Sequence, residues 1–204
     1  MKVLLINGSP HANGCTYTGL KHVAGVLKER GIDTEIIHIG AKPVGGCVAC
    51  EKCSETGRCV FDDIVNIVLK KIEKADAIVF GAPVYFASPN GSMIAFMDRL
   101  FNAGNFNHKP ACVIASARRG GCSASLDVLN KYPTYHRMPL VSGDYWPIIH
   151  GNTPAEVEQD LEGIYTLEVM AKDLAWIMKC IEAGKEEGIL PEVDNKTVWT
   201  NFIR

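Results

Sequence analysis

Hydrophobic and polar positions follow two rhythms along the chain, one typical of buried strands and one typical of helices. Short, almost continuous apolar runs predict five strands, at residues 3–6, 34–39, 77–81, 111–117 and 139–141. Apolar stripes with helical spacing predict helices at residues 16–30, 63–75, 92–103 and 154–183, with a short helix from residue 123. Thr153 followed by Pro154 is a typical start for the long last helix.

This alternation predicts an α/β fold in three layers, in which helices cover both faces of a five-stranded parallel sheet. Ligands of such sheets bind beyond the carboxyl ends of the strands. The loops of suggestive composition all follow a predicted strand, and they are residues 8–16, 40–62, 83–91 and 117–123. We therefore expect one domain at residues 1–183, a cysteine-rich insertion loop at 40–62 and a C-terminal tail at 184–204.

Composition agrees with a packed globular protein, since the 204 residues are 47% hydrophobic and 22% charged, with a mean hydropathy of +0.05. The net charge of -2 gives no support to nucleic acid or an anionic membrane as a partner. The first residues do not resemble a signal peptide, because Gly8-Ser9-Pro10 interrupts a short apolar run. No stretch reaches the roughly 18 apolar residues of a membrane helix. We expect a cytoplasmic protein whose thiols stay reduced.

The loop at residues 8–16 has the composition of a phosphate-binding loop. Its small residues let backbone N–H groups point inward, and the helix that follows adds a partial positive charge. It matches neither the G-x-G-x-x-G pattern of dinucleotide sites nor the Gly-Lys-Ser/Thr end of triphosphate loops. A phosphomonoester bound by Ser9, Asn13 and Thr16 is favoured over an ordinary strand-to-helix turn capped by Asn13.

Four of the eight cysteines fall in one loop, at positions Cys47, Cys50, Cys53 and Cys59. Four soft thiolates in a short loop favour a [4Fe–4S] cluster, and the spacing is similar to that of bacterial ferredoxins. Empty thiols and a zinc ion are the alternatives, whereas disulfides do not suit a reducing compartment. Among the other cysteines, Cys112 and Cys180 are predicted to be small core residues, and Cys122 a packing, surface or loop residue.

Taken in order along the chain, these loops resemble the flavodoxin-like NADPH-dependent FMN reductase family. The motifs that carry the resemblance are Gly8-Ser9-Pro10-x-x-Asn13-Gly14-x-Thr16, Pro83-Val84-Tyr85-Phe86, Phe96-Met97-Asp98-Arg99 and Arg118-Arg119-Gly120-Gly121. Tyr145-Trp146, His150-Gly151 and residues 200–204 add to it. The cysteine spacing, followed by Asp62-Asp63, resembles the iron–sulfur flavoprotein branch.

The resemblance implies one bound FMN and the residues that hold it. The FMN phosphate is expected near Ser9, His11, Asn13, Gly14, Cys15 and Thr16. The ring is expected against Pro83, Val84, Tyr85, Phe86, Ser116, Arg118, Arg119, Gly120 and Gly121. This chain departs from its relatives at two positions, because His11 stands where arginine is frequent and Cys15 where asparagine or serine is frequent.

The residues themselves agree with a ring site but leave alternatives open. Tyr85 and Phe86 offer flat apolar surfaces, although taken alone they read as core residues at a strand end. Arg118-Arg119 could neutralise a reduced flavin or meet a dinucleotide phosphate, or could lie in a solvated loop. Asp98-Arg99 is favoured as a structural pair or a subunit contact over a catalytic role.

We therefore predict an FMN-dependent oxidoreductase that uses NAD(P)H and passes electrons to a quinone, nitro or azo compound, to a protein, or singly to the cluster. No catalytic side chain is assigned; Tyr145, Trp146 and His150 could line the substrate face. An electron carrier without its own small substrate, and a cysteine-based metal-binding or redox-sensing module, are the alternatives. The apolar Trp146 and Phe202 segments suggest a homodimer or homotetramer.

Overall fold

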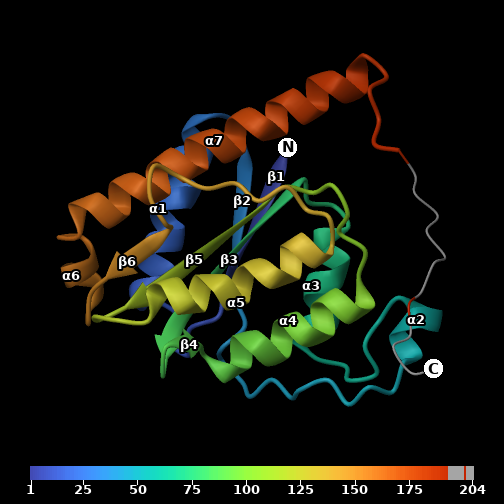
Figure 1. The fold of residues 1–204 in the computed structure, drawn as a ribbon, viewed down its shortest axis with the longest axis horizontal. Coiled ribbons are helices and arrows are strands. Elements are labelled where there is room, and N and C mark those ends of the chain that lie inside the picture. The colour runs from blue at the N-terminus through green and yellow to red at the C-terminus, as the bar shows by residue number, and fades with distance from the viewer. Residues whose placement is uncertain (193–199, 201–204) are drawn as a thin grey trace.

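The fold is a twisted parallel sheet between two layers of helices (Figure 1). The computed structural model describes residues 1–192 and residue 200. Five parallel strands lie in the order β2-β1-β3-β5-β6, and the short β4 pairs antiparallel with the end of β3. The strands are β1 (Lys2–Asn7), β2 (Asp33–His38), β3 (Ala77–Tyr85), β4 (Ser88–Pro89), β5 (Ala111–Ala117) and β6 (Ile148–His150). The predicted α/β architecture is confirmed.

Each face of the sheet has its own hydrophobic core, because successive strand residues point to opposite faces. Val3, Leu5 and Val79 pack under α1 (Cys15–Glu29) and α7 (Leu161–Glu186). Leu4, Ile6 and Phe80 face the other layer. That layer consists of α3 (Ile64–Ile72), α4 (Gly91–Ala103) and α5 (Cys122–Tyr135), as Figure 1 shows. The sheet is therefore buried on both faces, which leaves the loops at the strand ends open to a ligand.

The fifth strand lies at Ile148–His150, so its prediction at residues 139–141 is wrong. At residues 139–141 the chain makes only an isolated bridge between Leu140 and Ala111, at the start of β5. It then leaves the sheet and returns beside the end of β5, where Ala115 N–H donates to Pro147 C=O at 3.1 Å. Both segments are short, and each begins with or follows a proline. Only Ile148–His150 forms a ladder with β5, so only this segment is a strand.

The predicted helix at residues 154–183 is two helices, α6 (Pro154–Val157) and α7. Thr153 caps α6 as expected, since its hydroxyl accepts from Glu156 N–H at 3.3 Å. Asp160 starts α7, because one carboxylate oxygen accepts from Gly163 N–H at 3.0 Å and the other from His150 N–H at 2.7 Å. Asp160 thereby joins the start of α7 to the last strand.

Several loops hold more structure than expected. Residues 40–62 contain the short α2 (Lys52–Thr56), and β3 continues to Tyr85 where a loop was predicted from residue 83. The helix after residue 121 is α5, of 14 residues. The predicted tail begins inside a helix, because α7 continues to Glu186. Residues 193–199 and 201–204, which include Phe202, lie outside the described residues. None of the helices in the described part of the chain is long and apolar enough to span a membrane.

Two of the cysteines outside the insertion loop belong to the core. Cys112 on β5 is fully buried, as predicted. Cys122 at the start of α5 is buried too, so of the packing, surface and loop roles predicted for it the structure shows packing. Cys180 on α7 is exposed, so its prediction as a core residue is wrong.

The junction of β6 and α7 is expected to have no room for a side chain at Gly163. A Cβ at this position would overlap the Asp160 carboxylate and lie 2.9 Å from the backbone oxygen of Ile148. Gly163→Ala should therefore lower the free energy of unfolding by about 1–3 kcal/mol in urea denaturation. Gly25→Ala, in α1 with open space around it, is the control and should raise it by up to about 1 kcal/mol. Equal effects of both substitutions would contradict this packing.

The buried cysteines should resist alkylation. Burial raises the pKa of the Cys122 thiol to about 11 and raises the pKa of Cys112 further, so both thiols are neutral at pH 8. Brief treatment of the folded chain with iodoacetamide at pH 8, followed by peptide mass spectrometry, should modify the exposed Cys180 and leave Cys112 and Cys122 unmodified. Both should react after denaturation. Labelling of Cys112 as fast as Cys180 in the folded protein would show that the core is not closed.

Candidate functional site

The loop between β1 and α1 is held to the rest of the sheet edge by backbone contacts. Gly8 N–H donates to the carbonyl oxygen of Gly81 on β3 at 2.9 Å. The side-chain amide of Asn90, just before α4, donates to Gly8 C=O at 2.8 Å. The other amide atom of Asn90, its Oδ1, is buried without a hydrogen-bond partner among the described residues. Loops that follow two different strands therefore meet at one corner.

Asn7, the last residue of β1, shapes the loop from inside. Its side-chain oxygen accepts from Ser9 N–H at 3.1 Å, and its amide donates to Ala12 C=O at 3.2 Å. The Ser9 hydroxyl in turn accepts from His11 N–H at 3.1 Å. Asn7 was not among the predicted site residues, although a polar residue that ends an apolar strand before Gly8 was a signal that could have found it.

The start of α1 presents unpaired hydrogen-bond donors to this loop. The backbone N–H groups of Cys15, Thr16 and Tyr17 make no hydrogen bond to another described residue, as is usual for the first turn of a helix. The N-cap is Gly14 without a side-chain cap, so the alternative of a turn capped by Asn13 is wrong. The first turn carries no acidic residue. Such a set of donors suits a dianion such as a phosphate monoester.

Two hydroxyls extend the set of hydrogen-bond donors from the start of α1 toward the end of β5. Thr16 Oγ1 and Ser116 Oγ, at the end of β5, lie 2.6 Å apart, and both side chains are buried. The sequence placed these residues in different parts of the predicted site, and the structure brings them together. The Cys15 side chain bonds outside the loop, because its thiol donates to Gly151 C=O at 3.4 Å. Burial raises the pKa of this thiol. Only the backbone N–H of Cys15 is left for a ligand in the loop.

The end of β2 forms a wall of the loop that sequence reasoning missed. The ring nitrogen Nε2 of His38 lies 2.8 Å from Ser9 C=O. A Cβ on Gly40 would overlap the same carbonyl oxygen, so this position requires the close approach that glycine allows. His11 and Asn13, by contrast, are exposed. The loop is therefore a cradle closed by β2 and open at residues 11–13.

The predicted ring site is a hairpin rather than a loop. Val84 and Tyr85 pair with β4, and the two turn residues, Phe86 and Ala87, both have positive φ angles, of 52° and 58°. The Tyr85 side chain is half exposed and that of Phe86 is fully exposed. The alternative that these two aromatic residues belong to the core is therefore wrong.

The loop after β5 packs against this hairpin. Gly121 has a φ of 96°, and a Cβ there would lie 2.8 Å from Val84 Cγ1 and from Ala87 Cα, so glycine is required. Gly120, Arg118 and Arg119 are exposed, and neither arginine forms an ion pair within the described ranges 1–192 and 200. The phosphate loop, the hairpin and the residue 118–121 loop thus lie at the carboxyl ends of adjacent strands, as predicted.

All four cysteines of the insertion loop line one small pocket, together with Phe61 and Arg99. In residues 1–192 no three ligating side chains are gathered closely enough to hold a single metal ion. The donor set itself consists of four free thiols, and Cys47 and Cys50 are exposed. Soft thiolates suit iron–sulfur clusters, so the residues that line this pocket fit that group by their chemistry.

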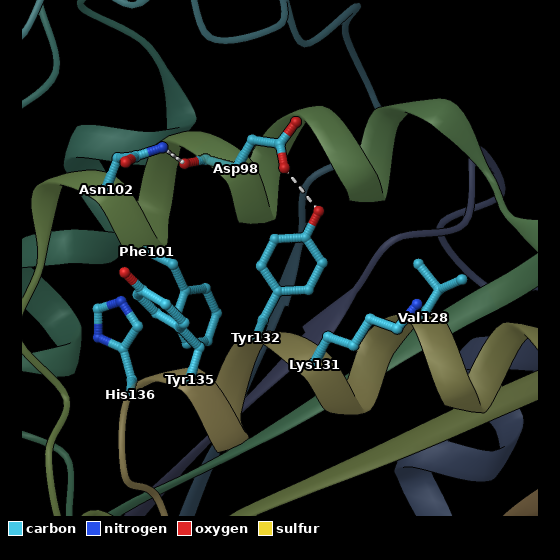
Figure 2. A pocket seen from close by; sticks show the side chains of 8 residues that line it. All are labelled: Asp98, Phe101, Asn102, Val128, Lys131, Tyr132, Tyr135 and His136. Atoms are coloured by element: carbon cyan, nitrogen blue, oxygen red, sulfur yellow. Dashed lines mark hydrogen bonds between the residues drawn. The ribbon is translucent and has the colours of Figure 1, made fainter. Parts of the chain in front are cut away.

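Asp98 and Arg99 do not form a pair with each other, although they are neighbours on α4. Asp98 accepts from the Tyr132 hydroxyl at 2.6 Å, and Figure 2 shows the two side chains meeting between α4 and α5. Arg99 points to the other side and binds Asp63 at 2.7 Å. The pocket of Figure 2, about 410 Å³ in volume, is lined by α4, α5 and His136 alone and includes no residue of the phosphate loop.

The last predicted site residues lie apart from these features. Tyr145 and Trp146 are exposed and in edge contact, with ring centroids 4.8 Å apart. His150 lies at the end of β6, where its backbone is bound by Asp160. No described contact joins them to the hairpin or to the cysteine pocket.

Comparison with known proteins assigns the chain to a family. A sequence model of the family described as NADPH-dependent FMN reductase matches residues 1–153. An iron–sulfur flavoprotein of Methanocaldococcus jannaschii is 31% identical over 193 residues, which cover 89% of this chain and all of the relative. The iron–sulfur flavoprotein of Methanosarcina thermophila is 29% identical over 193 residues, covering 92% of this chain and all of the relative.

Similar solved structures agree with the fold. A structure of RosB has a TM-score of 0.69 at 13% identity and covers all of this chain and 92% of its own. A flavodoxin from the Archaea has a TM-score of 0.59 at 15% identity, covering 88% of this chain and 99% of its own. The chain therefore belongs to the NADPH-dependent FMN reductase family, in its iron–sulfur flavoprotein branch, which confirms the resemblance found in its motifs.

Proposed function

We propose that this chain is an FMN-dependent oxidoreductase that accepts electrons from NAD(P)H and holds a [4Fe–4S] cluster beside its flavin. The observation that carries the proposal is the cradle between β1 and α1, in which the N–H groups of Cys15, Thr16 and Tyr17 bond to no other described residue. Membership in the family supports a flavoprotein oxidoreductase. The four cysteines in one pocket support the cluster.

In this proposal the cradle holds the FMN phosphate. The N–H groups at the start of α1 and the hydroxyls of Ser9 and Thr16 donate to it, and the helix start adds a favourable field. His11 and Asn13 lie at its open side, where they reach the phosphate without being part of the wall. The chain lacks an arginine here, so backbone donors carry most of the phosphate's charge.

The ring site is proposed on the surface that the hairpin and the loop after β5 form together. Tyr85 and Phe86 supply apolar surface, Ser116 and Gly121 lie next to them at the end of β5 and in the loop after it, and the exposed Arg118 and Arg119 supply positive charge. The bound FMN would supply transfer of two electrons at once or one at a time, which suits a junction between a nicotinamide and a one-electron centre. The protein contributes orientation and charge.

Helix α4 connects the two proposed cofactor sites. Asn90, next to its first residue, binds the phosphate loop, and Arg99, nine residues on, lies in the cysteine pocket. At a rise of 1.5 Å per residue this separation is about 14 Å along the helix. We propose Cys47, Cys50, Cys53 and Cys59 as the cluster ligands, and the exposure of Cys47 and Cys50 favours a protein as well as a small molecule as electron acceptor. A homodimer or homotetramer stays a prediction, supported here only by the exposed Trp146.

Anaerobic purification should yield a coloured protein with flavin absorption bands and a broad shoulder, together with four iron and four sulfide per chain. Stopped-flow mixing with NADH or NADPH should bleach the flavin bands. Cys50→Ser should lose the iron and keep the FMN, whereas Cys180→Ser, at an exposed cysteine of α7, should keep both. A colourless protein would exclude the proposed function, and a yellow protein without iron would exclude only its cluster.

Loss of the Thr16 hydroxyl should weaken FMN binding. A hydrogen bond to a charged group contributes about 1.5–3 kcal/mol, so Thr16→Val should raise the dissociation constant of FMN about tenfold to hundredfold in a flavin fluorescence titration. The control is Thr18→Val, which is buried on the same helix but whose hydroxyl donates to Gly14 C=O. An equal loss in both variants would indicate damage to the helix rather than a lost phosphate contact.

A further inference from the structure

We infer that Arg99 is a positioning residue for the cysteine site, which holds Cys59 in place and raises the reduction potential of the cluster bound there. The inference rests on the proposed function, because it assumes that the four cysteines hold a cluster. It concerns a residue whose side-chain hydrogen bonds, among the described residues, are with the insertion loop and with the N-cap of α3.

Cys59 differs from Cys47 and Cys50 in how firmly the protein holds it. The buried side chain of Asn66, on α3, accepts from Cys59 N–H at 2.9 Å and donates to Cys59 C=O at 2.9 Å. The same amide donates to Phe61 C=O at 3.0 Å. Cys59 is therefore fixed to the first turns of α3, whereas Cys47 and Cys50 lie exposed in the preceding loop.

The third contact of Cys59 is made by its sulfur. Nε of Arg99 donates to Cys59 Sγ at 3.2 Å. The two terminal nitrogens of the guanidinium are engaged elsewhere, since they bind the two carboxylate oxygens of Asp63 at 2.7 and 2.8 Å. This fork leaves Nε as the donor that faces the sulfur, which is a geometry that the planar guanidinium provides and an ammonium group does not.

The position of Arg99 is set by two helices. Its side chain is 1% exposed, on α4, and Asp63 is the N-cap of α3, where it accepts from Val65 N–H at 3.1 Å. The guanidinium also donates to Gly45 C=O at 3.3 Å and lies 4.9 Å from the centre of the Phe61 ring. The cation is thus buried between the helices and the insertion loop, in the wall of the pocket that all four cysteines line.

A buried cation that donates to a ligand sulfur affects the two redox states of a cluster differently. Reduction adds one negative charge, part of which lies on the sulfur atoms, and an N–H donor or a nearby positive charge stabilises that charge. Because Asp63 offsets the charge of the guanidinium, the Nε–H donor at the sulfur carries most of the effect, and burial strengthens it because water does not screen it. Arg99 should therefore make the cluster easier to reduce, and a role in folding alone would not change the potential.

The test uses the full chain, reconstituted anaerobically with iron and sulfide, and measures the midpoint potential by an optical redox titration. Arg99→Met leaves the Asp63 carboxylate without its partner, so the main variant is the double substitution Arg99→Met with Asp63→Asn, in which asparagine can still cap α3. Arg99→Lys keeps a positive charge and loses the Nε–H donor. The matched control is Arg58→Met, since Arg58 is adjacent to Cys59 in sequence but exposed, where it pairs with Asp62.

In the double variant we expect the equilibrium constant for cluster reduction to fall at least tenfold, which is a shift of 59 mV to lower potential for a one-electron couple. The cluster potential of Arg99→Lys should lie between those of the double variant and the wild type, and that of Arg58→Met should equal the wild-type value. The flavin potential, read in the same titration, should not change.

Three results would overturn the inference. A double variant that holds its cluster at the wild-type potential would leave the proposed function intact and remove the role of Arg99. Loss of iron in proportion to a lower melting temperature, with an unchanged potential in the chains that keep a cluster, would assign Arg99 to folding alone. A wild-type chain that takes up no cluster would overturn this inference together with the cluster part of the proposed function.

Discussion

The pairing of β1 with β3 at the carboxyl edge of the sheet is the contact on which the candidate site depends. The ladder runs from Val3 opposite Ala77 to Asn7 opposite Gly81, and Gly8 N–H extends it by one further bond to Gly81 C=O. A Cβ on Gly8 would lie 3.1 Å from that oxygen and 2.9 Å from a methionine sulfur, so a larger residue would open this corner. The protein's own hydrogen bonds thus fix the cradle, which lowers the ordering cost of binding an anion there.

The fold could be predicted from the sequence where a segment's own residues determine its secondary structure. It could not be predicted where contacts with a neighbouring segment determine that structure. The buried strands around Leu4 and Val79 have no polar face and could hardly be anything else. The fifth strand was misplaced because residues 139–141 and 148–150 both border proline, and only the ladder with β5 distinguishes them. The break before α7 was hidden because apolar spacing continues across it, although Asp160 three residues before Gly163 is a recognisable cap.

The candidate site could be predicted at the level of loops but not of contacts. Each predicted loop lies at the expected sheet edge, because parallel strands place their carboxyl ends together. The partners across loops, such as His38 against Ser9, depend on distances between strands that no local pattern contains. The separation of Asp98 from Arg99 could have been foreseen, since consecutive helical residues do not face each other. The identity of their partners, Tyr132 and Asp63, could not, because it follows from how three helices pack.

The hairpin tip at Phe86 and Ala87 is the place where local structure and sequence disagree most. A two-residue turn with positive φ at both positions favours Asn-Gly, and a left-handed conformation costs other residues about 1–2 kcal/mol each. The Phe86 ring recovers none of this against the described part of the chain, because it is fully exposed there. Strain that packing does not offset is typical of positions kept for binding. Covering an exposed apolar ring by a ligand or partner removes it from water, which lowers the free energy. The tip is therefore better explained by a ligand or partner that packs on Phe86 than by the stability of the hairpin.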